Sequence, residues 1–236
     1  MAEPGFYRTN YRALSIRELI RWRGVLKLPL SFILTRFVMR PTGGTWMPSL
    51  SGDLECTIEE LPPQFLARTE PQRAAVESLG FVPCFYSKLQ RNINAMMLET
   101  GSVTYLHSGG SYMGMIISGK VQTPPPLNTI KEYVHVGFTA VFDNKVESFS
   151  NAAARFDLSI EGRSTFVKSN DVGMIYQRFV NGVAHRRQAR VFTGCEDLRN
   201  WLDKTRLKGF ESNVKRGLFV RMTDAEVEQA RLQMPR

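Results

Sequence analysis

Three histidines and their neighbours are the first residues in this chain whose types suggest chemistry. His107 and His135 fall in segments with the alternating pattern of β-strands, and they could face the same side of a sheet with Tyr133 beside them. Such a group could line a polar pocket or transfer a proton. The alternative is that both histidines are partly exposed on a solvent-facing side of the sheet. Zinc would need a third ligand, and no Cys, Asp or Glu lies at a suitable spacing, so no metal site is predicted.

A basic run late in the chain could bind an anion. His185, Arg186 and Arg187 are consecutive, and Arg178 and Arg190 lie close by. Guanidinium groups at this density could hold a phosphate or the carboxylates of an acidic partner. RNA recognition favours basic and aromatic residues together on a sheet, whereas here the basic residues fall on predicted helices. Nucleic acid is therefore not expected as a partner.

No common catalytic motif is present. The chain lacks GxxxxGK(S/T), GxGxxG, HExxH, CxxC and GxSxG. This absence weakens the case for the common nucleotide-binding, dinucleotide-binding, zinc-protease and hydrolase classes. The sequence favours a protein without catalytic residues, and no cofactor is predicted.

The three cysteines, Cys56, Cys84 and Cys195, are far apart and odd in number. They match neither a metal site nor a dense disulfide framework, so a reducing compartment is the direct interpretation. Cys84 lies between Pro83 and Phe85, and we expect it to be a small buried apolar residue rather than a nucleophile. The start of the chain lacks the apolar core of a signal peptide, and a cytoplasmic location is expected.

The net charge of +9 is unevenly distributed. Residues 1–40 carry eight Lys or Arg and two Glu, and residues 178–221 carry eleven Lys or Arg and four Asp or Glu. The rest of the chain is slightly acidic. Two basic segments around an acidic middle suggest oriented contact with an anionic surface, although solvated helix faces can also be rich in Lys and Arg.

The strongest lead is VLKLPLSFILTRFVMR, residues 25–40. Its longest uncharged run, residues 28–35, has eight residues, whereas a spanning helix needs about 20, so no transmembrane span is predicted. Pro29 suits the first turn of a short helix. One stripe of this helix is apolar, and Phe32 and Met39 lie on the opposite side. The predicted stripe comprises Leu30, Ile33, Leu34, Phe37 and Val38.

That helix has three possible environments. It could pack into the core, form an interface in a homo-oligomer or larger assembly, or lie in the surface of an anionic membrane. The cations and the tryptophan around it are those that the third possibility needs, but the same apolar side chains, turned inward, would serve a core or an interface between copies equally well. The residues expected to bind the anionic surface are Arg17, Arg21, Trp22, Arg23, Lys27, Arg36 and Arg40.

Local signals predict the remaining elements. Capped helix starts occur at Ser15–Glu18, Thr69–Gln72, Thr193–Glu196 and Thr223–Glu226, and the second helix should end near Leu79. Strands are expected at 94–99, 102–108, 111–118 and 133–142, with a two-residue turn at Asp143-Asn144 leading to a fifth. Residues 170–193 fit either a hairpin through Asn181-Gly182 or a helix capped by Asn170 with Val172, Ile175 and Phe179 inward. The helix is favoured.

These signals predict an α+β protein. An antiparallel β-meander of about five strands should pack against several α-helices on one face. Residues 1–44 form a basic, apolar helical N-terminal segment, and residues 45–236 form a single α+β domain. The leading functional hypothesis is a protein whose N-terminal helices dock on an anionic membrane surface or an acidic partner. The alternatives are a pocket between sheet and helices, and a subunit that uses residues 25–40 as an interface.

Overall fold

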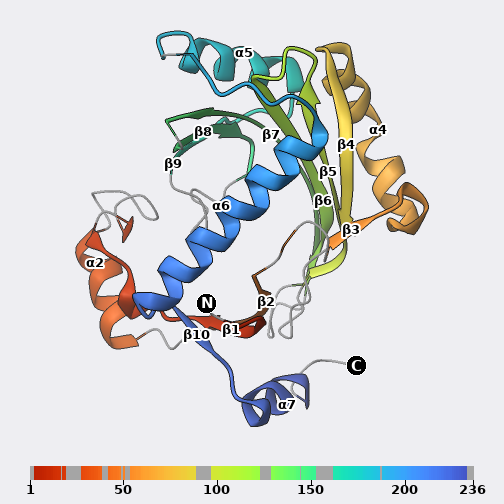
Figure 1. Ribbon diagram of the computed structural model, residues 1–236. Helices are drawn as coiled ribbons and strands as arrows, with labels where there is room; N and C mark the ends of the chain where they lie inside the picture. Colours follow the sequence, from red (N-terminus) through yellow and green to blue (C-terminus); the bar gives the residue numbers. More distant parts are fainter. Residues whose placement is uncertain are drawn as a thin grey trace.

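A computed structural model shows a mixed α+β architecture with two β-sheets (Figure 1). The structure describes residues 3–16, 18–19, 28–38, 42–48, 50, 54–88, 97–122, 129–143, 145–152, 162–186 and 188–232.

The larger sheet has seven strands in the order β3-β4-β5-β6-β7-β8-β9. Neighbouring strands are antiparallel from β3 to β8, and β9 pairs with β8 in parallel. The sheet is therefore mixed and larger than the meander of about five strands expected from the sequence. The strands are β3 (Glu55–Cys56), β4 (Phe81–Lys88), β5 (Met97–His107), β6 (Tyr112–Gln122), β7 (Ile130–Phe142), β8 (Lys145–Ser150) and β9 (Gly162–Phe166).

One predicted strand break is wrong. Thr100-Gly101 was expected to separate two strands, but both residues lie inside β5. The pairing of β5 with β6 shifts register between Leu98 and Gly101, so the residues that resembled a turn form an irregularity within the strand. The turn after β7 is confirmed, because Phe142 pairs directly with Lys145 and Asp143 adopts a positive φ of 47°.

Helices cover both faces of the large sheet, whereas one covered face was expected. We call these faces the α4/α5 face and the α6 face. The first buries sheet residues such as Tyr105, Ile116 and Phe138 against α4 (Pro63–Ser78) and α5 (Val172–Val183). The second buries Phe85, Leu106, Met113 and Val141 against the N-terminal half of α6 (Cys195–Lys215).

Helix α4 begins six residues before the capped start predicted at Thr69. Pro63 occupies its first turn, where the missing N–H costs no hydrogen bond. Thr69 lies inside the helix, and its hydroxyl donates to the Phe65 carbonyl at 2.8 Å. The predicted end near Leu79 is confirmed, and Gly80 follows with a φ of +86° that favours glycine.

Residues 170–193 contain a helix and not a hairpin. α5 buries Val172, Ile175 and Phe179 as the helical period predicts. Its N-cap is Asp171, one residue after the predicted cap, and the Asp171 carboxylate accepts from the Met174 amide at 2.9 Å.

A second, three-stranded sheet joins distant parts of the chain in the order β10-β1-β2. β1 (Gly5–Thr9) pairs antiparallel with both β10 (Phe219–Arg221) and β2 (Thr42–Met47). The C-terminal half of α6 packs here through Phe210, whose ring meets Tyr7 edge to face at 5.0 Å. Figure 1 shows α6 running from the large sheet toward the small one. Its side chains pack in the cores of both sheets. The last helix is α7 (Asp224–Leu232).

The predicted capping box at Ser15 is present. The Ser15 amide donates to the Glu18 carboxylate at 2.8 Å, and the Glu18 amide donates to the Ser15 hydroxyl at 3.3 Å. Leu19, the next residue of this helical turn, is fully buried. The rest of the helix predicted over residues 16–23 lies outside the described residues.

Candidate functional site

The helix after residue 27 presents its apolar stripe to solvent. α2 (Leu28–Ile33) continues into a π-helical turn, η3 (Leu34–Val38). Leu30 is 60% exposed, Ile33 is 53% exposed and Phe37 is 75% exposed. Of the three environments considered, packing into the core of this chain is therefore excluded for these three residues. The side chain of Val38 and all of Met39 lie outside the described residues.

Two small polar residues occupy the buried side of the same helix. Ser31 is 5% exposed and Thr35 is completely buried. The Thr35 hydroxyl donates to the Ser31 carbonyl at 2.8 Å, which satisfies the hydroxyl inside the helix itself. Small side chains let this side of the helix approach the protein closely, and the large side chains are consequently turned outward.

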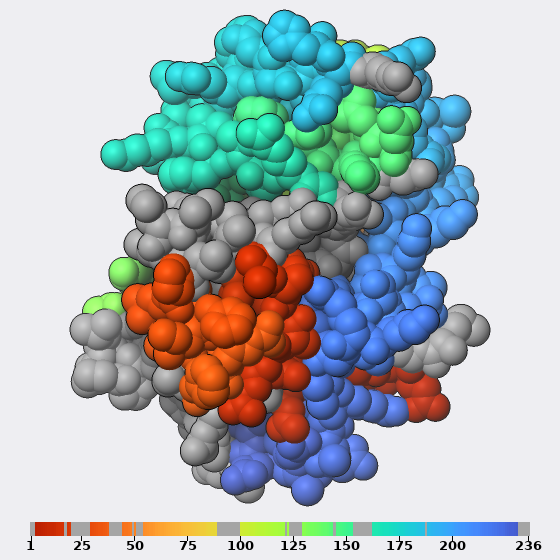
Figure 2. Space-filling view, turned by 90° about the vertical axis from the view of Figure 1, so that its left-hand side faces the viewer, coloured from red at the N-terminus to blue at the C-terminus, as the bar shows by residue number. Residues whose placement is uncertain are grey.

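Arg36 fixes the helix against the N-terminal segment. Its guanidinium donates to the Leu14 carbonyl at 2.8 Å and lies 5.3 Å from the centre of the Phe32 ring. Figure 2 shows α2 and η3 (orange) at the molecular surface, beside the N-terminal residues drawn in red. Ile16, in that neighbouring segment, is also exposed. We call Ile16, Leu30, Phe32, Ile33 and Phe37 the apolar surface.

Most of the cations predicted around this helix are not placed. Of the seven residues expected to bind an anionic surface, the structure describes Arg36 alone. The others, which lie outside the described residues, are Arg17, Arg21, Trp22, Arg23, Lys27 and Arg40.

An ion pair holds the helical turn that starts at Ser15 to the C-terminal end of α6. The Arg216 guanidinium donates two hydrogen bonds to the Glu18 carboxylate, at 2.8 and 2.6 Å. Burial alone would raise the pKa of the Glu18 carboxyl. The hydrogen bonds from Arg216 and Ser15 outweigh burial and lower this pKa to about 2.

Two residues of the predicted anion-binding run form internal ion pairs. Arg186 donates to Glu147 at 2.7 Å, and Arg190 donates to Asp197 at 3.1 Å. Arg178 and His185 are exposed on α5 and on the turn that follows it. Arg187 lies outside the described residues. Because two of the described cations already have carboxylate partners, the run is a weaker anion site than its composition suggests.

The predicted histidine pocket does not form. Tyr105 pairs with Gly114, and Gly114 pairs with Phe138, so these three residues share the α4/α5 face. His107 lies two residues after Tyr105 and shares that face, whereas His135 lies three residues before Phe138 and points to the α6 face. The expectation that the two histidines face the same side is therefore wrong.

His135 and Tyr133 do lie together. Their rings stack with centroids 4.9 Å apart, and the Tyr133 hydroxyl is 3.4 Å from the Thr100 hydroxyl. Burial lowers the pKa of the His135 imidazole, and a hydrogen bond with Asn151 partly offsets the effect. His107 instead packs its ring edge to face against Phe81, and its Nδ1 accepts from the Gly109 amide at 3.1 Å. Each histidine thus has its own aromatic neighbour, on its own side of the sheet.

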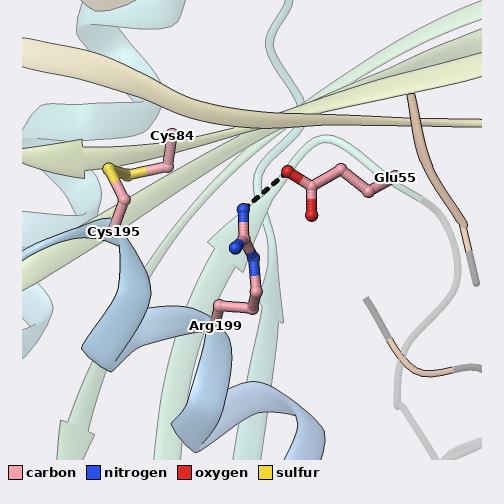
Figure 3. The surroundings of a disulfide bond; sticks show 4 residues. All are labelled: Glu55, Cys84, Cys195 and Arg199. Atoms are coloured by element: carbon pink, nitrogen blue, oxygen red, sulfur yellow. Dashed lines mark hydrogen bonds and ion pairs between the residues drawn. A yellow bond between two sulfur atoms is a disulfide. The ribbon is translucent and has the colours of Figure 1, made fainter. Parts of the chain in front are cut away.

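A disulfide joins two of the cysteines and contradicts the expectation that all three are reduced. Cys84 in β4 is bonded to Cys195 in the first turn of α6, 111 residues away (Figure 3). Cys84 lies at a register shift between β4 and β5, where the strand bulges. Nearby, Arg199 of α6 donates to Glu55 of β3 at 2.5 Å and lies over the Phe85 ring. Three cysteines without a spacing motif carry no signal for this pairing. Cys56 is free.

The described residues contain no group of three or more His, Cys, Asp and Glu side chains that could hold a metal ion. No helix in this part of the chain has the length and apolar character needed to cross a membrane.

Comparisons with known proteins add no family or function. A scan against protein-family models finds none that matches the chain. Searches of curated proteins and of solved structures likewise find no significant similarity.

Proposed function

We propose that the protein docks on an anionic membrane surface through α2, η3 and the basic residues around them. The observation that carries the proposal is the outward orientation of Leu30, Ile33 and Phe37. An interfacial helix needs an apolar side that enters the acyl boundary and cations beside it that meet the head groups. Residues 1–40 provide eight Lys or Arg against two Glu.

The expected energies suffice for reversible binding. Burying a large apolar side chain contributes about 1.5–3 kcal/mol, and only the exposed fraction of each side chain adds to binding. The three outward residues together therefore contribute roughly 3–6 kcal/mol. Each cation close to an anionic leaflet adds about 1 kcal/mol, a contribution that salt screens. Binding should accordingly weaken as ionic strength rises.

The location that follows is peripheral to a membrane. The expectation of a reducing compartment, which rested on the cysteines, loses its support, because disulfides form and persist mainly in oxidising compartments.

Vesicle co-sedimentation tests the proposal. The full chain should pellet with phosphatidylcholine vesicles that contain phosphatidylserine, and much less with phosphatidylcholine alone. Phe37→Asp should reduce the bound fraction at least tenfold, because it places a charge in the apolar surface. Met174→Asp is the matched control, since Met174 is also an exposed apolar residue, on the distant helix α5. It should bind as the wild type does.

Other occupants of the surface predict other results. If no vesicle binds and Phe37→Asp converts an oligomer to a monomer in light scattering, a second copy covers the surface and the proposal is wrong. Binding to poly-glutamate beads without binding to anionic vesicles would instead indicate an acidic protein partner. A variant with Arg21, Arg23 and Lys27 all changed to Glu separates the electrostatic attraction to the membrane from the burial of apolar side chains in it. It should abolish the preference for phosphatidylserine.

A further inference from the structure

We propose that the Cys84–Cys195 disulfide is a site of reversible thiol–disulfide exchange with a dithiol reductant, and that reduction releases the N-terminal half of α6 from the large sheet. This inference does not depend on membrane docking. It rests on where the bond lies, on its access to solvent, and on how α6 divides between two cores.

The disulfide lies at the N-terminal end of α6, and its two cysteines are partly exposed. Both cysteines are half-buried, and a side chain added at Gly194, the N-cap residue directly before Cys195, would meet nothing within 4 Å. There is therefore free space beside the first turn of α6, next to Cys195. Figure 3 shows the bond between β4 and the first turn of the helix, with Arg199 one turn further on and reaching toward Glu55.

The two halves of α6 belong to different clusters. Leu198, Trp201 and Leu202 pack on the large sheet, whereas Phe210 and Val214 pack with the small sheet. The disulfide ties only the first half, and the Arg216–Glu18 ion pair holds the far end. Opening the disulfide therefore removes a tie at one end of the helix and leaves the other end fixed.

The exchange balances with a dithiol as co-reactant. A thiolate of the reductant attacks Cys84 Sγ, the S–S bond breaks, and the electron pair leaves on Cys195 Sγ. The second thiol of the reductant, as thiolate, then attacks the reductant sulfur of the mixed disulfide and releases Cys84. The two protons of the dithiol end on Cys84 and Cys195, and the reductant is oxidised to a disulfide.

Cys195 is the better leaving group because of its position. The amide groups of the first helical turn stabilise a thiolate, and the thiol with the lower pKa leaves faster. Two acidic residues, Glu196 and Asp197, lie in the same turn and oppose this effect. Asp197 is already paired with Arg190 and accepts from the Thr193 amide at 3.2 Å, so its charge is partly compensated.

The test compares oxidised and dithiothreitol-treated full-length protein without denaturant. A Cys56→Ser background leaves only the disulfide cysteines to alkylate. Iodoacetamide followed by mass spectrometry should label both Cys84 and Cys195 after reduction, while circular dichroism stays native. Amide hydrogen exchange should accelerate at least tenfold in residues 195–202 and stay unchanged in 207–215. The unfolding equilibrium constant should rise by on the order of a thousandfold, as expected for opening a loop of this length.

Three results would overturn the proposal. The bond could resist dithiothreitol until the chain is denatured, which would make it a purely structural link. Reduction could abolish the native circular dichroism, which would mean that the whole fold depends on the bond. Reduction could also proceed without any change in the amide hydrogen exchange of residues 195–202. A Cys84→Ser, Cys195→Ser variant should reproduce the exchange pattern of the reduced protein, and the wild-type comparison stands by itself if that variant does not fold.

Discussion

Glu18 and Arg216 form an ion pair with two hydrogen bonds, at 2.6 and 2.8 Å, across 198 residues of sequence. The pair joins the helical turn that starts at Ser15 to Arg216, the C-cap residue of α6. It therefore anchors the segment that carries the apolar surface to the protein.

Glu18→Gln should destabilise the protein by roughly 1–3 kcal/mol at neutral pH, a range already reduced for partial solvent screening. The folded-state pKa of about 2 is below the ordinary value of 4.5, so the ionised form is the one that folding favours. This contribution is fully present above about pH 4.5 and is lost as the pH falls toward 2. Urea unfolding at pH 7 and pH 3 should show a smaller difference between variant and wild type at pH 3. Glu70→Gln, at an exposed position of α4, is the control and should follow the wild type at both pH values.

The orientation of α2 and η3 can be tested by stability alone. Phe37→Asp should change the free energy of unfolding by less than about 0.5 kcal/mol, because the side chain is largely solvated. Thr35→Asp should cost at least about 2 kcal/mol, because it buries a charge at a fully covered position. Thermal and urea unfolding of both variants check this. The reverse order would mean that the apolar stripe faces the core.

Gly182→Ala should destabilise α5 even though alanine is the better helix former. A Cβ at this position would lie 2.2 Å from the tip of the Phe149 ring, so the ring has to move. We expect a net cost of about 1–2 kcal/mol. In a Phe149→Ala background the obstruction is gone, and the same change should stabilise by up to about 1 kcal/mol. A double-mutant cycle by urea unfolding measures whether the effect of Gly182→Ala on the free energy of unfolding changes sign between the two backgrounds. The same sign in both would show that the ring does not rest on Gly182.

Asp171→Ala should remove the cap of α5 and cost about 1 kcal/mol. The Asp171 carboxylate accepts from the Met174 amide, whereas the Asn170 side chain accepts from the side chain of Asn151. Asn170→Ala should therefore cost less than about 0.5 kcal/mol. Equal losses in urea unfolding would show that the two residues share the cap.

Elements that depend on near neighbours could be predicted from the sequence. The capping boxes at Ser15 and Thr223 formed because each partner lies three residues away. Helix α5 formed because its apolar residues keep a 3.6-residue period for three turns. The Asn181-Gly182 pair resembled a hairpin turn, but the glycine makes room for Phe149 of β8.

Features that depend on distant residues could not be predicted. The disulfide spans 111 residues and follows no spacing rule. The outward orientation of Leu30 and Phe37 depends on Arg36 reaching the Leu14 carbonyl and on small residues turned inward. A helical period identifies the two sides of a helix, but it cannot state which side the rest of the chain covers. The prediction of a histidine pocket was wrong for a similar reason, since strand register decides which face of the sheet each histidine side chain lies on.

The pairing of β1 with β10 has a consequence for synthesis of the chain. A ribosome makes residues 5–9 first, but their antiparallel partner at 219–221 is made more than two hundred residues later. All seven strands of the large sheet lie between these points, so that sheet can assemble while the small one is still incomplete. Until residues 219–221 emerge, one edge of β1 stays open to other strands. Nascent chains should therefore protect the large sheet from protease before they protect the N-terminal segment.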